Sequence, residues 1–150
     1  MTNWTKRLVL AGAALALVGA AGIGAAFAQA DAIKARQALY KNNGAAMQAI
    51  KAVVDAKGPT EPVAAEAAKL INTFKNVTAH YPAGSDAGET KASPDIWKNM
   101  ADFQALNANA LTAATKLEAD AKKGDVAVVA TDFGDMGKAC GACHNKYRLK

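Results

Sequence analysis

The sequence predicts an all-α protein built as an antiparallel four-helix bundle. Four segments of the chain repeat apolar residues at steps of three and four, which is the spacing of helices with one buried face. Alanine is abundant, and no alternating strand pattern of useful length interrupts these segments. Short turns separate the first helix from the second and the third from the fourth, so each pair is expected to run antiparallel.

Residues 1–28 form a predicted signal peptide. Lys6 and Arg7 precede a long uncharged stretch rich in alanine, leucine, valine and glycine, and small residues on both sides of Phe27 predict cleavage after Ala28. The apolar stretch is long for a signal peptide, so an uncleaved membrane anchor is the alternative. The many alanine and glycine residues of the stretch disfavour that alternative.

Cleavage after Ala28 leaves residues 29–150, a length that fits one domain with a modest core. The formal net charge falls from +5 to +3, because the leader contains two of the basic residues and no acidic ones. The remaining lysines and arginines form no run, whereas nucleic-acid binding requires a concentrated basic patch. The composition therefore argues against a nucleic-acid partner.

The first helix is expected from Asp31 to Ala56, where Gly58-Pro59 ends it. Its buried face is a bundle seam made of Ile33, Arg36, Tyr40, Asn43, Met47, Ile50 and Val54. The second helix is expected to begin after Thr60, a candidate N-cap, and to fade near residues 80–82. Its inner face consists of Val63, Ala67, Leu70, Phe74 and Val77.

A long loop over residues 81–92 precedes the third helix, which Ser93-Pro94-Asp95 opens with a serine N-cap and a proline in the first turn. The inner face of this helix contains Ile96, Met100, Phe103, Leu106, Ala110 and Leu117, and Lys122-Lys123-Gly124 ends it. Asp125 is the expected cap of the fourth helix, whose inner face consists of Val129, Phe133, Met136, Cys140, Cys143 and Tyr147. Gly134 and Gly137 are small residues that would permit close approach of a flat ring or a neighbouring helix.

The most informative motif is Cys-x-x-Cys-His at residues 140–144, the attachment pattern of a c-type haem. On a helix, Cys140 and Cys143 point to one side, so each thiol can bond to one porphyrin vinyl group. His144 then offers a ring nitrogen as an axial ligand to the iron. Three other interpretations are weaker. A zinc site would need more cysteine or histidine ligands than the chain offers, and a thioredoxin-like dithiol would need a βαβ setting. A structural disulfide between these cysteines would close almost no loop and so stabilise little.

Several segments together resemble the class II c-type cytochromes, which comprise cytochrome c prime and cytochrome c-556. They are the C-terminal position of the haem motif, the run DAIKARQ in the first helix, SPDIW at the start of the third, and CGACHNKYR in the last. The resemblance covers essentially the whole mature chain. It implies a four-helix bundle with one haem c in its core, held covalently through Cys140 and Cys143.

The resemblance also implies roles for individual residues. His144 corresponds to the iron ligand, and Arg36 and Gln37 correspond to positions beside the haem and its propionates. Three further residues are implied at the haem edge: Thr90 and Lys91 in the loop, and Arg148 next to the iron ligand. The alternative for Lys91, a solvated loop charge, is slightly favoured. Arg36 has an alternative interpretation, in which its head group extends to solvent. His80 is expected at a helix end rather than on the iron, and Trp97 in the core.

Tyr40 occupies the position that faces the free side of the iron in relatives, where cytochrome c-556 carries a methionine ligand. A neutral phenol is a poor ligand, so the resemblance implies a five-coordinate, high-spin iron that binds nitric oxide and carbon monoxide, with electron transfer as a second role. The alternative is a six-coordinate electron carrier of the c-556 type. Met47, two turns further along the same seam, would ligate only if the first helix were shifted, and is expected to fill the core.

The sequence predicts no catalytic residues, since no second titratable cluster accompanies the motif. The expected partners are small gaseous ligands and an unknown redox protein, with no membrane association after cleavage. Export and covalent haem attachment together favour the periplasm. The outer faces of the first two helices, where many relatives pair, permit a homodimer without demanding one.

Overall fold

The computed structural model describes residues 18–150, with side chains from Phe27 onward. Its main helices are α1 (Val18–Ala56), α2 (Glu61–Asn76), α4 (Met100–Ala121) and α5 (Val126–Tyr147). Two short elements lie between α2 and α4, namely the 3-10 turn η1 (Val77–His80) and α3 (Asp95–Lys98). Within the described residues, extended pairing is limited to one antiparallel bridge between Ala92 and Arg148.

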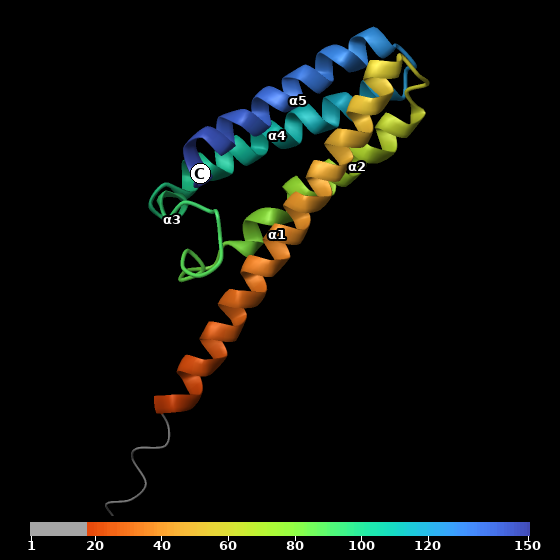
Figure 1. Cartoon of the computed structure of the whole chain (residues 1–150). Coiled ribbons are helices and arrows are strands. Elements are labelled where there is room, and N and C mark those ends of the chain that lie inside the picture. The colour runs from red at the N-terminus through yellow and green to blue at the C-terminus, as the bar shows by residue number, and fades with distance from the viewer. Residues whose placement is uncertain (1–17) are drawn as a thin grey trace, which may run out of the picture.

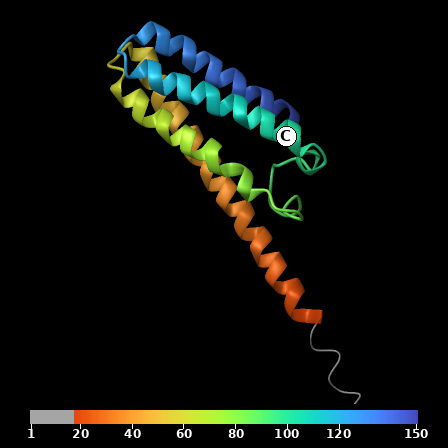
Figure 2. The ribbon, with the colours of Figure 1, turned by 180° about the vertical axis from the view of Figure 1, so that it is seen from behind.

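The four long helices form the predicted antiparallel bundle. In Figure 1, α1 and α2 run side by side in opposite directions, and α4 and α5 form a second such pair against them. Figure 2 shows the same arrangement from behind, with the N-terminal part of α1 extending well beyond the other helices. The bundle prediction is therefore confirmed.

The first helix begins earlier than predicted. α1 continues without a break from Val18 through the predicted cleavage point after Ala28 and on to Ala56. Residues 1–17, most of the predicted signal peptide, lie outside the described residues. Among the helices that the structure does describe, none combines the length and apolarity needed to cross a membrane.

Thr60 occupies the predicted N-cap position before α2, but its side chain does not cap the helix. Its backbone is already helical (φ −90°, ψ −10°), and its side chain accepts no hydrogen bond from the start of α2. The buried Thr60 hydroxyl instead donates to the carbonyl oxygen of Ala121 at 2.6 Å. This bond joins the start of α2 to the end of α4, so a residue chosen for a local role forms a contact between helices.

The third predicted helix is divided in two. Asn99 leaves the helical conformation (φ −130°, ψ 43°) and separates α3 from α4. Ser93 still stabilises the start, because its Oγ accepts a hydrogen bond from the backbone nitrogen of Asp95 at 3.2 Å. The predicted cap of the last helix is confirmed, since the Asp125 carboxylate accepts from the backbone nitrogens of Ala127 and Val128.

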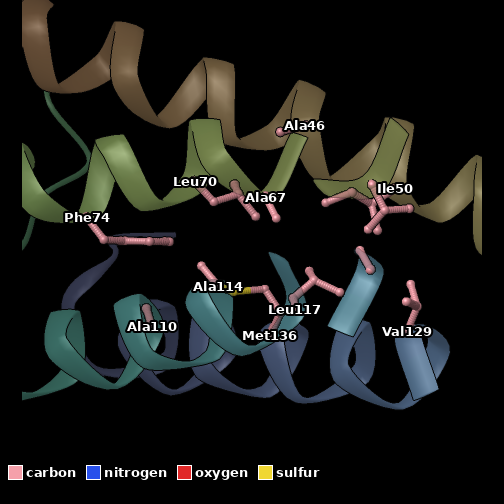
Figure 3. Packing of buried hydrophobic residues seen from close by; sticks show 12 residues of the cluster. Ala46, Ile50, Ala67, Leu70, Phe74, Ala110, Ala114, Leu117, Val129 and Met136 are labelled. Carbon is pink, nitrogen blue, oxygen red and sulfur yellow. The ribbon is translucent and has the colours of Figure 1, made fainter. Parts of the chain in front are cut away.

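The main core lies between the α1–α2 pair and the α4–α5 pair, as Figure 3 shows. The predicted inner faces supply it, with Ile50, Leu70, Leu117 and Met136 fully buried. No neighbouring helix approaches Gly134 or Gly137 closely, because a Cβ atom at either position would meet no protein atom within 4 Å, and close approach of a flat ring there stays a prediction. Neither glycine is therefore a point of close helix approach.

A polar contact also links α4 to α5. The Lys116 ammonium lies 2.5 Å from Oδ1 of Asp132 and 2.7 Å from Oδ2 of Asp120. The Asp132 side chain is almost completely buried, and a buried charge is tolerated only when it is paired. Lys116 thereby compensates a carboxylate that would otherwise oppose the packing of these two helices.

Replacing Leu70 with alanine tests the packing of the main core. Because Leu70 is fully buried, we expect Leu70→Ala to lower the free energy of unfolding by about 2–5 kcal/mol in urea titrations of the haem-loaded protein. The matched control is Leu149→Ala, which removes the same atoms from a side chain that is 45% exposed and is expected to have little effect. Equal losses at the two positions would contradict this description of the core.

Candidate haem site

A cavity of about 570 Å³ lies at the end of the bundle that the 81–92 loop covers. This volume falls within the range of pockets that bind cofactors and other small molecules. All nine residues predicted for the site line it: Arg36, Gln37, Tyr40, Thr90, Lys91, Cys140, Cys143, His144 and Arg148. Apolar side chains from α2, α3 and α4 complete the walls, among them Phe74, Ile96, Phe103, Leu106 and Ala110.

One wall is the C-terminal part of α5, which carries the haem motif. Cys140 and Cys143 are both partly buried, and burial raises the pKa of each thiol. The two are three residues apart on one helix and so face the same side. The pKa of His144 is lowered, mainly by partial burial and further by the charge of Arg148. The imidazole is therefore neutral near pH 7 and has a nitrogen lone pair available for a metal.

The opposite wall is α1, and Arg36 is its most constrained residue. The side chain is 2% exposed, so the alternative in which its head group extends to solvent is wrong. The guanidinium donates to the His80 carbonyl (3.2 Å), to Oγ and the carbonyl oxygen of Ser85 (2.8 and 2.5 Å) and to Oγ1 of Thr90 (3.0 Å). All of these acceptors are uncharged, and burial lowers the pKa of Arg36.

Aromatic rings also surround the Arg36 charge. Its guanidinium carbon lies 4.8 Å from the ring centre of Tyr81 and 5.5 Å from that of Trp97, within the range of cation–π attraction. Trp97 packs against the neighbouring core cluster as expected, and its indole nitrogen donates to the Pro82 carbonyl. Arg36 therefore binds the start of the loop through both hydrogen bonds and rings.

Sequence reasoning missed Ser85 and Tyr81. Ser85 is completely buried, accepts from Arg36 and donates to the Pro82 carbonyl at 2.9 Å. Tyr81 is 7% exposed and lines the cavity. A serine among glycine and polar loop residues carries no sequence signal of burial. Gly84 and Gly88 lie where the loop turns, and both have positive φ angles that other residues rarely adopt.

The rest of the loop is held at the rim of the cavity. Gln37 donates to the Glu89 carbonyl at 2.8 Å, which attaches the loop to α1 a second time. The backbone nitrogen of Leu149 donates to the Lys91 carbonyl at 2.8 Å, which attaches the loop to the C-terminal tail. Lys91 and Arg148 are exposed, so both present their charges at the edge of the cavity. His80 is absent from the cavity wall, as predicted.

Tyr40 and Met47 both line the cavity but belong to different clusters. Tyr40 packs in the cluster that includes Cys143, the cysteine directly before His144. Met47 packs in the main core, in the cluster that includes Cys140. The pKa of Tyr40 is raised, chiefly by burial and further by Tyr81, so its phenol stays protonated.

A hydrogen-bonded pair supports the last turn of α5 beside the motif. The Tyr147 ring is buried against the cavity and packs edge-on against Phe103. Its hydroxyl donates to Oδ2 of Asp102 on α4 at 2.6 Å, and Lys146 lies 2.8 Å from the same oxygen. These contacts fix the helix turn that carries His144 against α4.

The residues present fit a covalently held haem. Two thiols on one wall suit the two vinyl groups, and the adjacent imidazole suits the iron. The interior is apolar, while Arg36 and the exposed charges of Lys91 and Arg148 suit the anionic propionates. Within residues 18–150, no group of three or more histidine, cysteine or acidic side chains gathers as a zinc site would require.

Comparison with known proteins agrees with this geometry. The sequence profile described as cytochrome c′ matches residues 31–148. The chain belongs to the cytochrome c′ family. The cofactor of the family is haem c, which the Cys-x-x-Cys-His motif is built to attach. Among its relatives, cytochrome c′ of Allochromatium vinosum is 35% identical over 143 residues, covering 91% of this chain and 92% of that protein. Cytochrome c-556 of Agrobacterium fabrum is 34% identical over 136 residues, covering 89% of this chain and 91% of that protein.

Solved cytochrome c′ structures share the fold. One, described with a ligand-controlled dimer dissociation, has a TM-score of 0.77 and 33% identity, covering 81% of this chain and 97% of that one. Two variants of the Alcaligenes xylosoxidans protein, one in complex with nitric oxide and one with carbon monoxide bound, each have a TM-score of 0.74 and 29% identity. Each alignment covers 81% of this chain and 97% of the other. The predicted fold class and family are thus confirmed.

The contact between Asp102 and α5 makes stability depend on pH. Lys146 and then Tyr147 hold the pKa of the Asp102 carboxyl below its ordinary value of about 3.9. Its stabilisation is therefore complete above about pH 4 and is lost as the pH falls through the lowered folded-state pKa. We expect Asp102→Asn to unfold at lower urea than the parent at pH 7, with the gap narrowing towards pH 3.

Asp31→Asn is the control for that titration, because Asp31 is an exposed aspartate on α1, a helix that takes no part in the contact between Asp102 and α5. It is expected to follow the parent protein at both pH values. A gap between Asp102→Asn and the parent that is constant from pH 7 to pH 3 would contradict the proposed role of the Asp102 charge.

Proposed function

We propose that this protein is a periplasmic cytochrome c′ that binds nitric oxide and carbon monoxide at a five-coordinate haem iron. The observation that carries the proposal is the position of Tyr40, a protonated phenol on the wall opposite the haem motif and in the cluster of Cys143. A neutral phenol is a weak iron ligand, so this wall shields the metal without ligating it.

The other side chains of the site have distinct tasks in this proposal. Cys140 and Cys143 anchor the cofactor, and His144 supplies the single protein ligand. Arg36 holds the loop in place and sets a positive charge near the propionates, while Gln37 and Thr90 fix the loop against it. When bound, haem supplies a metal whose free side small neutral gases can reach.

Lys91 and Arg148 complete the set at the rim. Both are exposed, and the backbone around them is paired through the bridge between Ala92 and Arg148. In this proposal Lys91 and Arg148 lie beside the propionates at the outer edge of the haem, where their positive charges offset the anionic carboxylates. The solved nitric oxide and carbon monoxide complexes of a related protein support the choice of gases.

Electron transfer remains the second candidate function. Two observations favour it: relatives of similar identity include cytochrome c-556, and Met47 lies on the cavity wall with a sulfur that would suit iron. Met47 packs with the main core rather than with Cys143, which favours Tyr40 as the residue over the metal. We also propose that the protein carries no catalytic activity, since no second cluster of titratable side chains accompanies the haem motif and His80 lies away from the cavity wall.

We further propose export and pairing. The leader 1–28 directs the chain across the inner membrane, and the mature protein is not held there by it. A homodimer through the outer faces of α1 and α2 is consistent with the solved relative described as a dissociating dimer.

Exchanging the residue over the metal tests the proposal. We expect the purified ferric protein to show broad high-spin bands, and Tyr40→Met to move the visible spectrum towards low spin because a thioether binds iron where a phenol does not. Met47→Leu is the matched control and is expected to leave the spin state of the parent unchanged. A low-spin parent that becomes high spin in Met47→Leu would instead establish the electron-carrier alternative.

The N-terminus of the mature protein tests the leader. Expression in a host that matures c-type cytochromes is expected to yield a coloured periplasmic protein that begins at Gln29, as measured by mass spectrometry of the intact chain. A coloured protein that stays in the membrane fraction with residues 1–28 attached would show that the leader is an anchor.

A further inference from the structure

We propose that Tyr81 is a positioning residue for Tyr40: its hydroxyl anchors the Tyr40 ring over the free side of the haem iron, so that an entering gas must break this contact. The inference rests on the proposed gas-binding function and adds to it the residue that controls access to the metal. It concerns a side chain that the sequence analysis placed in the loop without a role.

The ring of Tyr81 is held from three sides. Its centre lies 4.7 Å from that of Phe103 on α4 and 5.5 Å from that of Trp97 on α3, and both pairs are tilted. The guanidinium carbon of Arg36 on α1 lies 4.8 Å from the same ring centre. Aromatic pairs at these separations attract, and so does a cation over a ring. Tyr81 is therefore a fixed support at the wall of the cavity, where it is 7% exposed.

The Tyr81 hydroxyl forms a hydrogen bond with the Tyr40 hydroxyl. Both residues line the cavity and pack in the same cluster. Burial raises the pKa of Tyr40, and the charge of Tyr81 and the hydrogen bond to it raise this pKa further. Burial also raises the pKa of Tyr81, but the same bond opposes that rise. A hydrogen bond raises the pKa of the phenol that donates and lowers that of the phenol that accepts, so Tyr40 donates and Tyr81 accepts.

Tyr40 is held less firmly than its partner. It is only partly buried, and the close aromatic pairs found among the described residues do not include it. Rotation about the Cα–Cβ bond offers such a side chain a few staggered positions, and the cavity beside it leaves room for more than one. The bond to the fixed hydroxyl of Tyr81 favours one of these positions. Tyr81 thereby determines where the Tyr40 ring lies on the wall opposite the haem motif.

An anchored ring affects how fast a gas binds rather than how fast it leaves. To reach the metal, the gas must displace the Tyr40 ring, and the hydrogen bond to Tyr81 breaks as the ring moves. Losing one neutral hydrogen bond in this step slows association by about threefold to tenfold. While the gas is bound the ring is already displaced and the bond already broken. The Tyr81 hydroxyl is accordingly expected to leave the dissociation rate unchanged.

The test measures carbon monoxide binding to the ferrous, haem-loaded protein by stopped flow. It compares the parent with Tyr81→Phe, which keeps the ring and its contacts and removes the hydroxyl. We expect carbon monoxide to associate about threefold to tenfold faster with the variant and to dissociate at the parent rate. Tyr40→Phe removes the other half of the bond and is expected to speed association by a similar factor. In the double variant, Tyr81→Phe is expected to add nothing to the effect of Tyr40→Phe, because the bond is already gone.

The outcomes separate the two proposals. Equal association rates for the parent and Tyr81→Phe overturn the role of Tyr81 and leave gas binding intact. Effects of the two substitutions that multiply in the double variant also overturn it, because Tyr81 would then act independently of Tyr40. Failure of the ferrous parent to bind carbon monoxide overturns the proposed function, and the role of Tyr81 with it. If Tyr81→Phe yields no haem-loaded protein, Tyr40→Phe alone decides: faster association supports the anchor, and an unchanged rate overturns it.

Discussion

The buried charge of Arg36 is the constraint on which the rest of the site depends. A guanidinium that is 2% exposed must find hydrogen-bond acceptors, and in this fold the acceptors come from the long loop after α2. Because Ser85 and Thr90 of the loop accept hydrogen bonds from it, the loop would lose these bonds and its packing against the guanidinium on leaving α1. The cavity keeps its outer wall for that reason.

A different set of contacts holds the wall formed by α5. The last turn of α5 carries His144 and is fixed to α4 through the Tyr147 hydroxyl and the Asp102 carboxylate. Two helices from different pairs of the bundle thus present their chemistry to one space, with Tyr40 on one side and the thiols on the other. The main core extends further along the bundle and sets the spacing of these helices, and at its near end Phe74 and Ala110 form part of the cavity wall.

Most of the fold could be read from the sequence because helical period and burial coincide. The seam of α1 and the inner faces of the other helices are buried as their spacing predicts, and the haem motif located the site. Contacts between distant segments could not be predicted from the sequence, as the hydrogen bond from Thr60 to α4 shows. The break between α3 and α4 at Asn99 was also not predicted. Ser85 was missed because its burial depends on its hydrogen bond to Arg36, and the sequence does not indicate which residues of the loop this arginine contacts.

The bridge between Ala92 and Arg148 has a consequence for the order of assembly. Its two backbone bonds, from Ser93 to Tyr147 and from Leu149 to Lys91, join the loop to residues that are far from it along the chain. Contacts between segments so distant along the chain form late, since loop-closure entropy opposes them until nearby structure exists. The rim around the cavity is therefore completed late in folding, so the thiols of Cys140 and Cys143 stay accessible until then.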